Sequence, residues 1–243
     1  MPQLFKATNK DVELVKNKDV LEGLWNKQFS TTYELDELSD NTKNYLTDLV
    51  KRLKVGIVLD NGCGTGRIKK FFEKKGWVSY GTDLSSEALK IASRLSPINL
   101  ICAPSHNLPF KDEYFDLIIF WRVLHNIPLK TRKLAMQESA RILKKGGFFL
   151  CSVQSKEDEE TLGLYKQYGI ELEEDRNTYV VSHVVGDTKM PYLKHFFSRE
   201  DILSEVQKNT GIKVTKISEL VEKSGLKAVD RKEQKYWLIE AKK

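Results

Sequence analysis

The apolar residues of this chain first follow a helical spacing and then form short continuous runs. The clearest helical pattern lies between 41 and 53, where apolar residues recur at intervals of three and four. They are Tyr45, Leu46, Leu49, Val50 and Leu53. Residues 1 to about 52 are predicted to be helical throughout. The pattern then changes at Gly56-Ile57-Val58-Leu59-Asp60, a continuous apolar run that is typical of a strand covered on both faces.

Apolar runs and helical patterns alternate through the rest of the first 154 residues. The predicted strands are 56–60, 77–83, 98–103, 115–121 and 148–153, and the helices between them are 67–75, 86–95 and 129–143. Ser85 or Ser86 caps the second of these helices, and Gly146-Gly147 is read as the stop of the third. Alternation of this kind predicts right-handed crossovers and a parallel sheet. Near the end, Ser198 caps a further helix, and strands at 213–220 and 235–241 close the sheet.

Residues 155–197 interrupt this alternation with two charge runs and a group of aromatic residues. The segment is longer than a usual connection, which favours a lid or a binding insertion after the fifth strand. Tyr179-Val180-Val181 and His183-Val184-Val185 predict a strand pair within it. Its aromatic residues either line a ligand pocket or form a satellite core or a dimer contact. The pocket contacts expected under the first reading are Tyr165, Tyr168, His183, Tyr192 and His195.

A glycine-rich loop follows the first strand. It reads Leu59-Asp60-Asn61-Gly62-Cys63-Gly64-Thr65-Gly66-Arg67. Glycine lets the backbone turn tightly and lets a ligand approach the main chain. A dinucleotide site has the spacing G-x-G-x-x-G, but Arg67 stands where the last glycine is needed. Asp60 would also repel a pyrophosphate and attract the ammonium and sulfonium charges of S-adenosylmethionine. The alternative is a structural turn that binds nothing.

An acidic residue ends the second strand, about twenty residues after the glycine loop. A carboxylate at this place can accept both hydroxyls of a ribose, and Leu84 beside Asp83 would then lie against the adenine. Taken alone, Asp83 is better explained as a helix N-cap. Together with Asp60 and the glycines, the ribose role is the favoured interpretation.

With these motifs in this order, residues 54–153 resemble the class I S-adenosylmethionine-dependent methyltransferases, in particular the small-molecule-type group with an L-P-F turn. Besides the glycine loop and Asp83, the matching positions are Leu108-Pro109-Phe110 for that turn, Phe115-Asp116, Leu124-His125-Asn126, and Leu143-Lys144-Lys145-Gly146-Gly147 with Lys145 in place of proline. The resemblance implies S-adenosylmethionine as the cofactor. The residues expected to bind it are Asp60, Gly62, Gly64, Gly66, Asp83, Leu84, Ser105 and Phe120.

One position departs from the family pattern. An acid–alanine pair that contacts the adenine commonly precedes the L-P-F turn, and Pro104 and Ser105 stand there instead. The side-chain acceptor is therefore missing. The Ser105 backbone, or a side chain among Ser105, His106 and Asn107, takes its place in our interpretation.

The chain is thus predicted to be a single α/β domain with a Rossmann-like, mainly parallel seven-stranded sheet flanked by helices. Its parts are an N-terminal helical cap at 1–52, a cofactor-binding core at 53–154, a lid or substrate insertion at 155–197, and the C-terminal part of the sheet at 198–243. In the cap, Trp25 and Phe29 resemble the aromatic segment that closes over the cofactor in related enzymes, with packing in a helical core as the equal alternative.

Residues for catalysis are poorly marked, because methyl transfer needs alignment and exclusion of water more than a dedicated base. The candidates are Trp121, Arg122 and His125 after the fourth strand, and His195 on the insertion. Each has a structural alternative: a core aromatic for Trp121, an ion pair for Arg122, and a hydrogen-bonded interior position for His125. No zinc, P-loop or Ser/His/Asp signature is present, and no metal is expected.

The acceptor is the least determined part of the function. The net charge of +6 permits RNA, but the lysines are scattered and no nucleic-acid module is appended. A small-molecule acceptor is therefore favoured, with a tRNA or rRNA methyltransferase and a non-catalytic cofactor-binding protein as alternatives. Three separated cysteines, no signal peptide and no apolar stretch of membrane length predict a cytoplasmic protein. The oligomeric state is left open.

Overall fold

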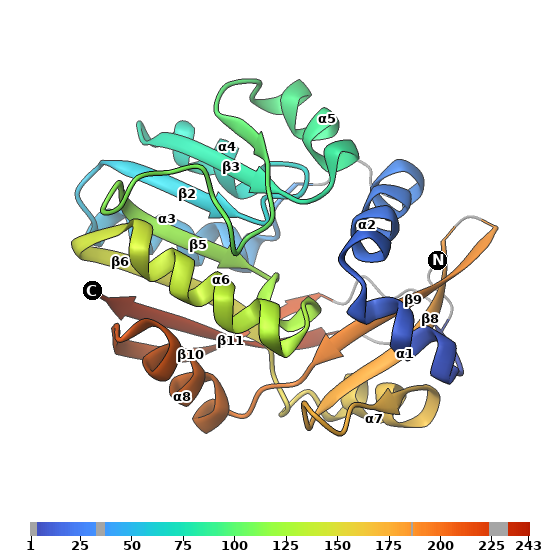
Figure 1. Cartoon of the computed structure of the whole chain (residues 1–243). Helices are drawn as coiled ribbons and strands as arrows, with labels where there is room; N and C mark the ends of the chain where they lie inside the picture. The colour runs from blue at the N-terminus through green and yellow to red at the C-terminus, as the bar shows by residue number, and fades with distance from the viewer. Residues whose placement is uncertain (1–3, 33–36, 186, 224–232) are drawn as a thin grey trace.

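A seven-stranded sheet with helices on both faces forms most of the molecule, and a second, smaller sheet stands beside it (Figure 1). The structure is a computed structural model that describes residues 4–32, 37–185, 187–223 and 233–243. No helix within these ranges is long and apolar enough to cross a membrane.

The large sheet has the strand order β10-β11-β6-β5-β2-β3-β4. The strands are β2 (Ile57–Asn61), β3 (Val78–Asp83), β4 (Leu100–Cys102), β5 (Phe115–Trp121), β6 (Leu143–Gln154), β10 (Lys213–Lys223) and β11 (Glu233–Lys242). Strand β11 runs in the opposite direction to the other six strands of this sheet. Strand β2 lies between β3 and β5, so the winding direction reverses there. At such a point the carboxyl ends of the strands leave a crevice in which α/β proteins bind ligands.

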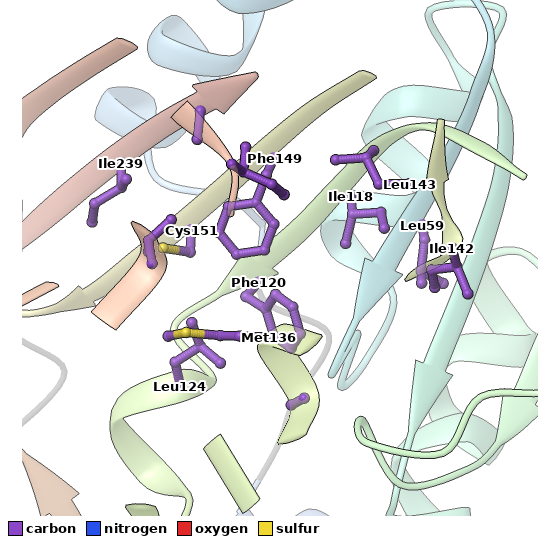
Figure 2. Close-up of a cluster of buried hydrophobic side chains, with 14 of the residues drawn as sticks. Leu59, Ile118, Phe120, Leu124, Met136, Ile142, Leu143, Phe149, Cys151 and Ile239 are labelled. Carbon is purple, nitrogen blue, oxygen red and sulfur yellow. The ribbon is translucent and has the colours of Figure 1, made fainter. Parts of the chain in front are cut away.

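Helices cover the two faces of this sheet in the way that the apolar runs require. They are α3 (Asp40–Arg52), α4 (Arg67–Glu73), α5 (Ser86–Leu95), α6 (Leu129–Ile142) and α8 (Arg199–Thr210). Along β5, Ile118 and Phe120 pack in the cluster that includes α6 and α8, as Figure 2 shows in part, while Leu117 and Ile119 pack in the cluster with α3 and α4. All four side chains are buried. The predicted α/β architecture with a mainly parallel seven-stranded sheet is confirmed.

Two local predictions in this part were wrong. Strand β6 begins at Leu143, directly after α6, so Gly146-Gly147 lies within the strand and does not end the helix. The helix ends because Leu143 is already extended, with φ −79° and ψ 131°. The N-terminal segment is not helical throughout, since Leu4–Phe5 forms strand β1 and pairs with His183 and Ser182. Helices α1 (Asn9–Lys16) and α2 (Lys18–Thr32) follow it.

The second sheet is built from the insertion and from β1. It consists of β1, β7 (Ile170–Glu171), β8 (Thr178–Val185) and β9 (Thr188–His195), with α7 (Glu159–Tyr168) beside it. The predicted strand pair at 179–181 and 183–185 is wrong, because both segments belong to the continuous strand β8. Ser182, at the expected break, pairs with Pro191 of β9 and with Phe5 of β1.

Most aromatic residues of the insertion form a satellite core, which is the second of the two predicted alternatives. Its buried members are Leu162, Tyr165, Tyr179, Val181 and Phe196. Tyr165 was expected in a ligand pocket, but only 2% of it is exposed and its ring packs edge-on against Phe196. Tyr168, His183 and Tyr192 are only half-buried. Of the five residues predicted to contact a ligand, these three therefore have exposed surface.

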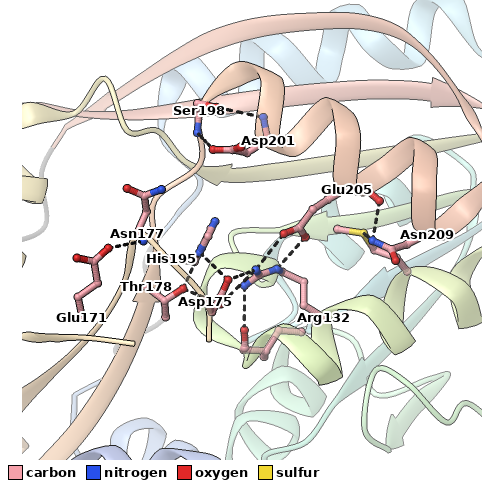
Figure 3. A network of polar contacts seen from close by, with 12 residues as sticks. Arg132, Glu171, Asp175, Asn177, Thr178, His195, Ser198, Asp201, Glu205 and Asn209 are labelled. Carbon is pink, nitrogen blue, oxygen red and sulfur yellow. Dashed lines mark hydrogen bonds and ion pairs between the residues drawn. The ribbon is translucent and has the colours of Figure 1, made fainter. Parts of the chain in front are cut away.

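A buried ionic network joins the second sheet to the large one (Figure 3). Arg132 of α6 is fully buried and donates to Asp175 at 3.1 and 3.3 Å and to Glu205 of α8 at 2.9 and 3.0 Å. Thr178 donates to the same Asp175 carboxylate at 2.6 Å and lies 2.6 Å from His195 Nδ1. One guanidinium thus fixes the start of β8 against two helices of the large sheet.

Candidate functional site

The glycine loop turns directly after β2. The amides of Gly62 and Cys63 both donate to the carbonyl of Thr82, at 2.8 and 2.9 Å, which ties the loop to β3. Gly62, Gly64 and Gly66 all have positive φ, at +80°, +52° and +78°. A Cβ on Gly62 would lie 2.5 Å from Val123, and one on Gly66 would lie 3.0 Å from Ala92. Packing therefore requires glycine at these two positions, whatever the loop binds.

Gly64 differs from the other two glycines. A Cβ on Gly64 would meet only Phe29 among the residues that the structure describes, with Cζ at 3.3 Å. Its amide donates to Asp83 Oδ2 at 2.8 Å. Gly64 is thus the member of the motif whose lack of a side chain opens the loop toward the carboxyl end of β3.

Asp83 lies at the carboxyl end of β3 and organises the loop around it. Its Oδ1 accepts from the Ser85 amide at 2.9 Å, while Oδ2 accepts from Gly64. The N-cap alternative for Asp83 is wrong, because Ser85 is the residue whose side chain caps α5, accepting from Ala88 at 3.1 Å. Each carboxylate oxygen of Asp83 still has a second lone pair for a ligand hydroxyl.

Asp60 is buried at the end of β2, with one oxygen satisfied. Oδ2 accepts from the Lys69 amide at 3.1 Å, whereas Oδ1 and the neighbouring Asn61 Nδ2 are buried without a partner among the described residues. Burial raises the pKa of the Asp60 carboxyl to about 7, and it also raises the pKa of Asp83. Buried polar atoms without a partner are uncommon in folded proteins. A donor-bearing cationic ligand at this loop would satisfy the acid, so the residues present fit the ammonium of S-adenosylmethionine.

The remaining predicted cofactor contacts divide into two groups. Leu84, after β3, and Ser105, in the turn after β4, are half-buried at the carboxyl edge of the sheet. Phe120 is fully buried and packs against Phe149, with ring centroids 5.9 Å apart. The prediction for Phe120 does not agree with this placement, because its side chain points into the core under α6.

Helix α2 lies across this edge, between α5 and the β8–β9 hairpin (Figure 1). Asn26 Oδ1 accepts from the Ser85 hydroxyl at 2.8 Å and from the Glu87 amide at 3.3 Å. Phe29 lies against Gly64, and Trp25 packs edge-on against Tyr192 with centroids 5.7 Å apart. The two N-terminal aromatic residues thus connect the glycine loop to the second sheet.

Three of the four residues predicted for catalysis make contacts that hold the fold together. Trp121 packs against Tyr45 of α3, with centroids 6.1 Å apart. His125 is buried, and its Nδ1 accepts the Gln154 amide at 3.1 Å. Burial lowers the pKa of His125 well below its usual value, so the ring is neutral. His195 belongs to the Arg132 network, and burial lowers its pKa to about 2. In the described part of the chain, none of the three presents an exposed group for proton transfer at the carboxyl edge of the sheet.

Arg122 is the fourth candidate and stands at the carboxyl end of β5. It has a φ of +64°, unusual for a residue with a side chain. Its amide donates to the Ser152 carbonyl at 3.2 Å and hydroxyl at 2.9 Å, which holds this conformation. The guanidinium lies over the Tyr236 ring, 4.8 Å from its centroid, in an exposed side chain. The structure therefore leaves Arg122 facing outward at the edge that carries the glycine loop.

Comparison with known proteins agrees with this geometry. Residues 59–151 match the family model described as methyltransferase domain. Residues 59–151 are thus a methyltransferase domain of the S-adenosylmethionine-dependent type. S-adenosylmethionine is the cofactor of this family, and it supplies an activated methyl group on a sulfonium centre. The matched residues include Asp60, the three glycines and Asp83.

Individual relatives of this chain differ in what their names say they methylate. The chain is 34% identical over 111 residues to the tRNA (carboxymethyluridine(34)-5-O)-methyltransferase of Arabidopsis thaliana, covering 45% of this chain and 27% of that protein. It is 26% identical to the ubiquinone biosynthesis O-methyltransferase of Nitrosomonas europaea, covering 60% and 63%. A methyltransferase structure from Methanosarcina mazei superposes with a TM-score of 0.67 at 19% identity, covering 86% and 99%. The chain therefore spans about a quarter of the first relative and less than two thirds of the second.

Replacing Asp83 by alanine is expected to weaken binding of S-adenosylhomocysteine about 10- to 100-fold. The substitution removes two charge-assisted acceptors, worth about 1–3 kcal/mol in binding. It also releases the Gly64 amide that Asp83 holds. Isothermal titration calorimetry measures the change, with Asp48→Ala, an exposed acid of α3, as the control. An unchanged affinity in Asp83→Ala would remove Asp83 from the ribose site.

Affinity for S-adenosylhomocysteine is expected to rise with pH between 6 and 7.3. The pKa of Asp60 is about 7 in the free protein, so most of this carboxyl is protonated at pH 6. A ligand ammonium favours the ionised form, and its own proton stays bound in this range. Affinity should therefore gain roughly fivefold across the interval. Calorimetry at several pH values tests this, and the same series with Asp60→Asn should be flat.

Proposed function

We propose that this methyltransferase transfers the methyl group of S-adenosylmethionine to a small-molecule acceptor by in-line displacement. The observation that carries the proposal is the cover over the carboxyl end of β5. There the Tyr192 hydroxyl of β9 donates to Asn126 Oδ1 at 2.9 Å, and Trp25 of α2 packs on the same tyrosine. An acceptor beneath this cover must be small, because elements of the second sheet and of the cap already contact the large sheet on two sides.

In this proposal the chain's own residues bind and orient the cofactor and exclude water from the site. Asp83 would accept the ribose hydroxyls and Asp60 would face the ammonium, while Leu84 and Ser105 would border the adenine. Phe29 and Trp25 would exclude water from the crevice. Alignment of two reactants in a dry site accounts for much of the barrier lowering in such a displacement.

The names of the relatives agree with a small-molecule acceptor in one case and with a tRNA acceptor in another. The Nitrosomonas relative is named for ubiquinone biosynthesis, which agrees with a small planar acceptor. The Arabidopsis relative is named for a tRNA uridine, and the net charge of +6 agrees with an RNA acceptor. The match to the Arabidopsis protein covers only about a quarter of that protein's length. A tRNA methyltransferase is therefore the second candidate and not the first.

A transfer assay separates the candidates. The protein is incubated with methyl-labelled S-adenosylmethionine and either a panel of phenols, quinols and amines or total tRNA, with Gly64→Val as the inactive control. Label in at least one small compound and none in tRNA is the expected result. Label in tRNA alone, with RNA affinity that falls steeply with added salt, would replace the proposal by the second candidate. No label in either would favour a cofactor-binding protein without catalysis.

A further inference from the structure

A row of aromatic side chains leads from the glycine loop to the second sheet. Phe29 lies against Gly64, Trp25 is 6.3 Å from Phe29, and Tyr192 is 5.7 Å from Trp25, measured between ring centroids. His183 ends the row, with its ring 4.9 Å from that of Tyr192 and tilted by 38°. Flat faces of this kind bind planar ligands by stacking.

His183 is the residue of this row that can take part in proton transfer. Its Nε2 is buried without a hydrogen-bond partner, and no residue that the structure describes bonds to its Nδ1. An enclosed imidazole nitrogen without a partner destabilises the protein unless a donor reaches it. Another buried histidine nitrogen, Nε2 of His195, lies on a ring that Thr178 and Asp175 already fix. Among the residues that the structure describes, none fixes the His183 ring by a hydrogen bond.

Lys194 adds positive charge to the same place. Only 8% of Lys194 is exposed, and its ammonium lies over the rings of Tyr165 and Tyr192, 5.5 and 5.8 Å from their centroids. Burial and this charge lower the pKa of His183 to about 4, so the imidazole is neutral at pH 7 and accepts a hydrogen bond. A cation near the acceptor also stabilises negative charge on an oxygen that gives up its proton.

We infer that His183 is the group that accepts the hydrogen of a planar acceptor bound along this aromatic row. The inference rests on the proposed function. The acceptor class is a flat ring that carries an O–H or N–H donor, whether the ring is free or part of a nucleotide. His183 holds the donor, and Tyr192, fixed by Asn126, supports the ring.

The step balances without a further reactant. The acceptor's oxygen or nitrogen forms its bond to the methyl carbon as the bond from that carbon to sulfur breaks, and the electron pair stays on sulfur. The proton of the acceptor passes to an imidazole nitrogen of His183 and leaves to water when the product is released. His183 is neutral before and after a turnover.

The test uses binding to the full chain loaded with S-adenosylhomocysteine. The probes are catechol and uracil, each compared with its fully methylated partner, 1,2-dimethoxybenzene and 1,3-dimethyluracil, and a uridine-containing oligonucleotide distinguishes a free ring from a nucleotide. Affinities come from titration, and nitrogen chemical shifts of ¹⁵N-histidine report on the imidazole of His183. The variants are His183→Phe, which keeps a ring on Tyr192, and His183→Gln, which keeps an acceptor.

We expect at least one donor-bearing probe to bind about tenfold more tightly than its methylated partner, because it makes one additional hydrogen bond. This probe should shift an unprotonated nitrogen of His183. His183→Phe should lose the preference, and His183→Gln should retain part of it. The inference is overturned if no donor probe shifts His183, or if His183→Phe keeps the preference. Failure of S-adenosylhomocysteine to bind in the first step would instead overturn the proposed function, and the inference with it.

Discussion

Replacing Gly64 by valine is expected to lower the affinity for S-adenosylhomocysteine by more than about 100-fold, or roughly 3 kcal/mol. A branched side chain does not tolerate a φ of +52°, so the loop must change its backbone conformation. The valine would also approach Phe29, and a changed backbone would disturb the bond from the residue 64 amide to Asp83. Calorimetry on the purified variant measures the loss.

Gly76→Val is the matched control for this prediction. Gly76 also has a positive φ, at +82°, but no atom of a described residue lies within 4 Å of a Cβ built there, and it precedes the opposite end of β3. Both variants should therefore lose stability through backbone strain of about 1–3 kcal/mol. Only Gly64→Val should lose the ligand. Equal binding by the two folded variants would show that this loop is not the cofactor site.

Replacing Arg132 by methionine is expected to lower the free energy of unfolding by about 3–5 kcal/mol. The substitution leaves Asp175 and Glu205 facing each other without the cation between them, and 7% and 18% of their side chains are exposed. It also removes the contact of the guanidinium with the Phe197 ring, 5.1 Å from the centroid. Urea unfolding at pH 7 measures the change.

Two comparisons make the Arg132 result specific. Lys133→Met, on the exposed side of the same helix, should change stability by less than about 0.5 kcal/mol. Adding Asp175→Asn and Glu205→Gln to Arg132→Met should restore part of the loss, because the repelling charges are removed with the cation. A loss in Arg132→Met no larger than that in Lys133→Met would show that the network contributes little to holding the second sheet.

The core of the fold was predictable because its physical requirements are local. A strand such as β5, buried on both faces, has to be apolar at every position, and α3 has to present one apolar side. Because the run is apolar throughout, it does not indicate on which face of the sheet each side chain lies. Ile118 and Phe120 point one way and Leu117 and Ile119 the other, so sequence alone did not show that Phe120 faces α6 and not the crevice.

The insertion was less predictable because its contacts join distant parts of the chain. Nothing near Arg132 in the sequence announces Asp175 or Glu205, and β1 finds its partner about 180 residues away. The aromatic residues of the insertion indicated that their side chains are covered, but not whether a ligand or a satellite core covers them. His183 was one of several possible contacts, and only its position beside Tyr192, with neither ring nitrogen bonded to a described residue, distinguishes it.

A crystal structure with S-adenosylhomocysteine tests the central claim most directly. We expect the ligand at the carboxyl ends of β2 and β3, with both ribose hydroxyls on Asp83 and the amino group toward Asp60. Its sulfur should face the cover formed by Trp25 and Tyr192. A ligand bound elsewhere, or one bound at this edge without contact to Asp83, would contradict it.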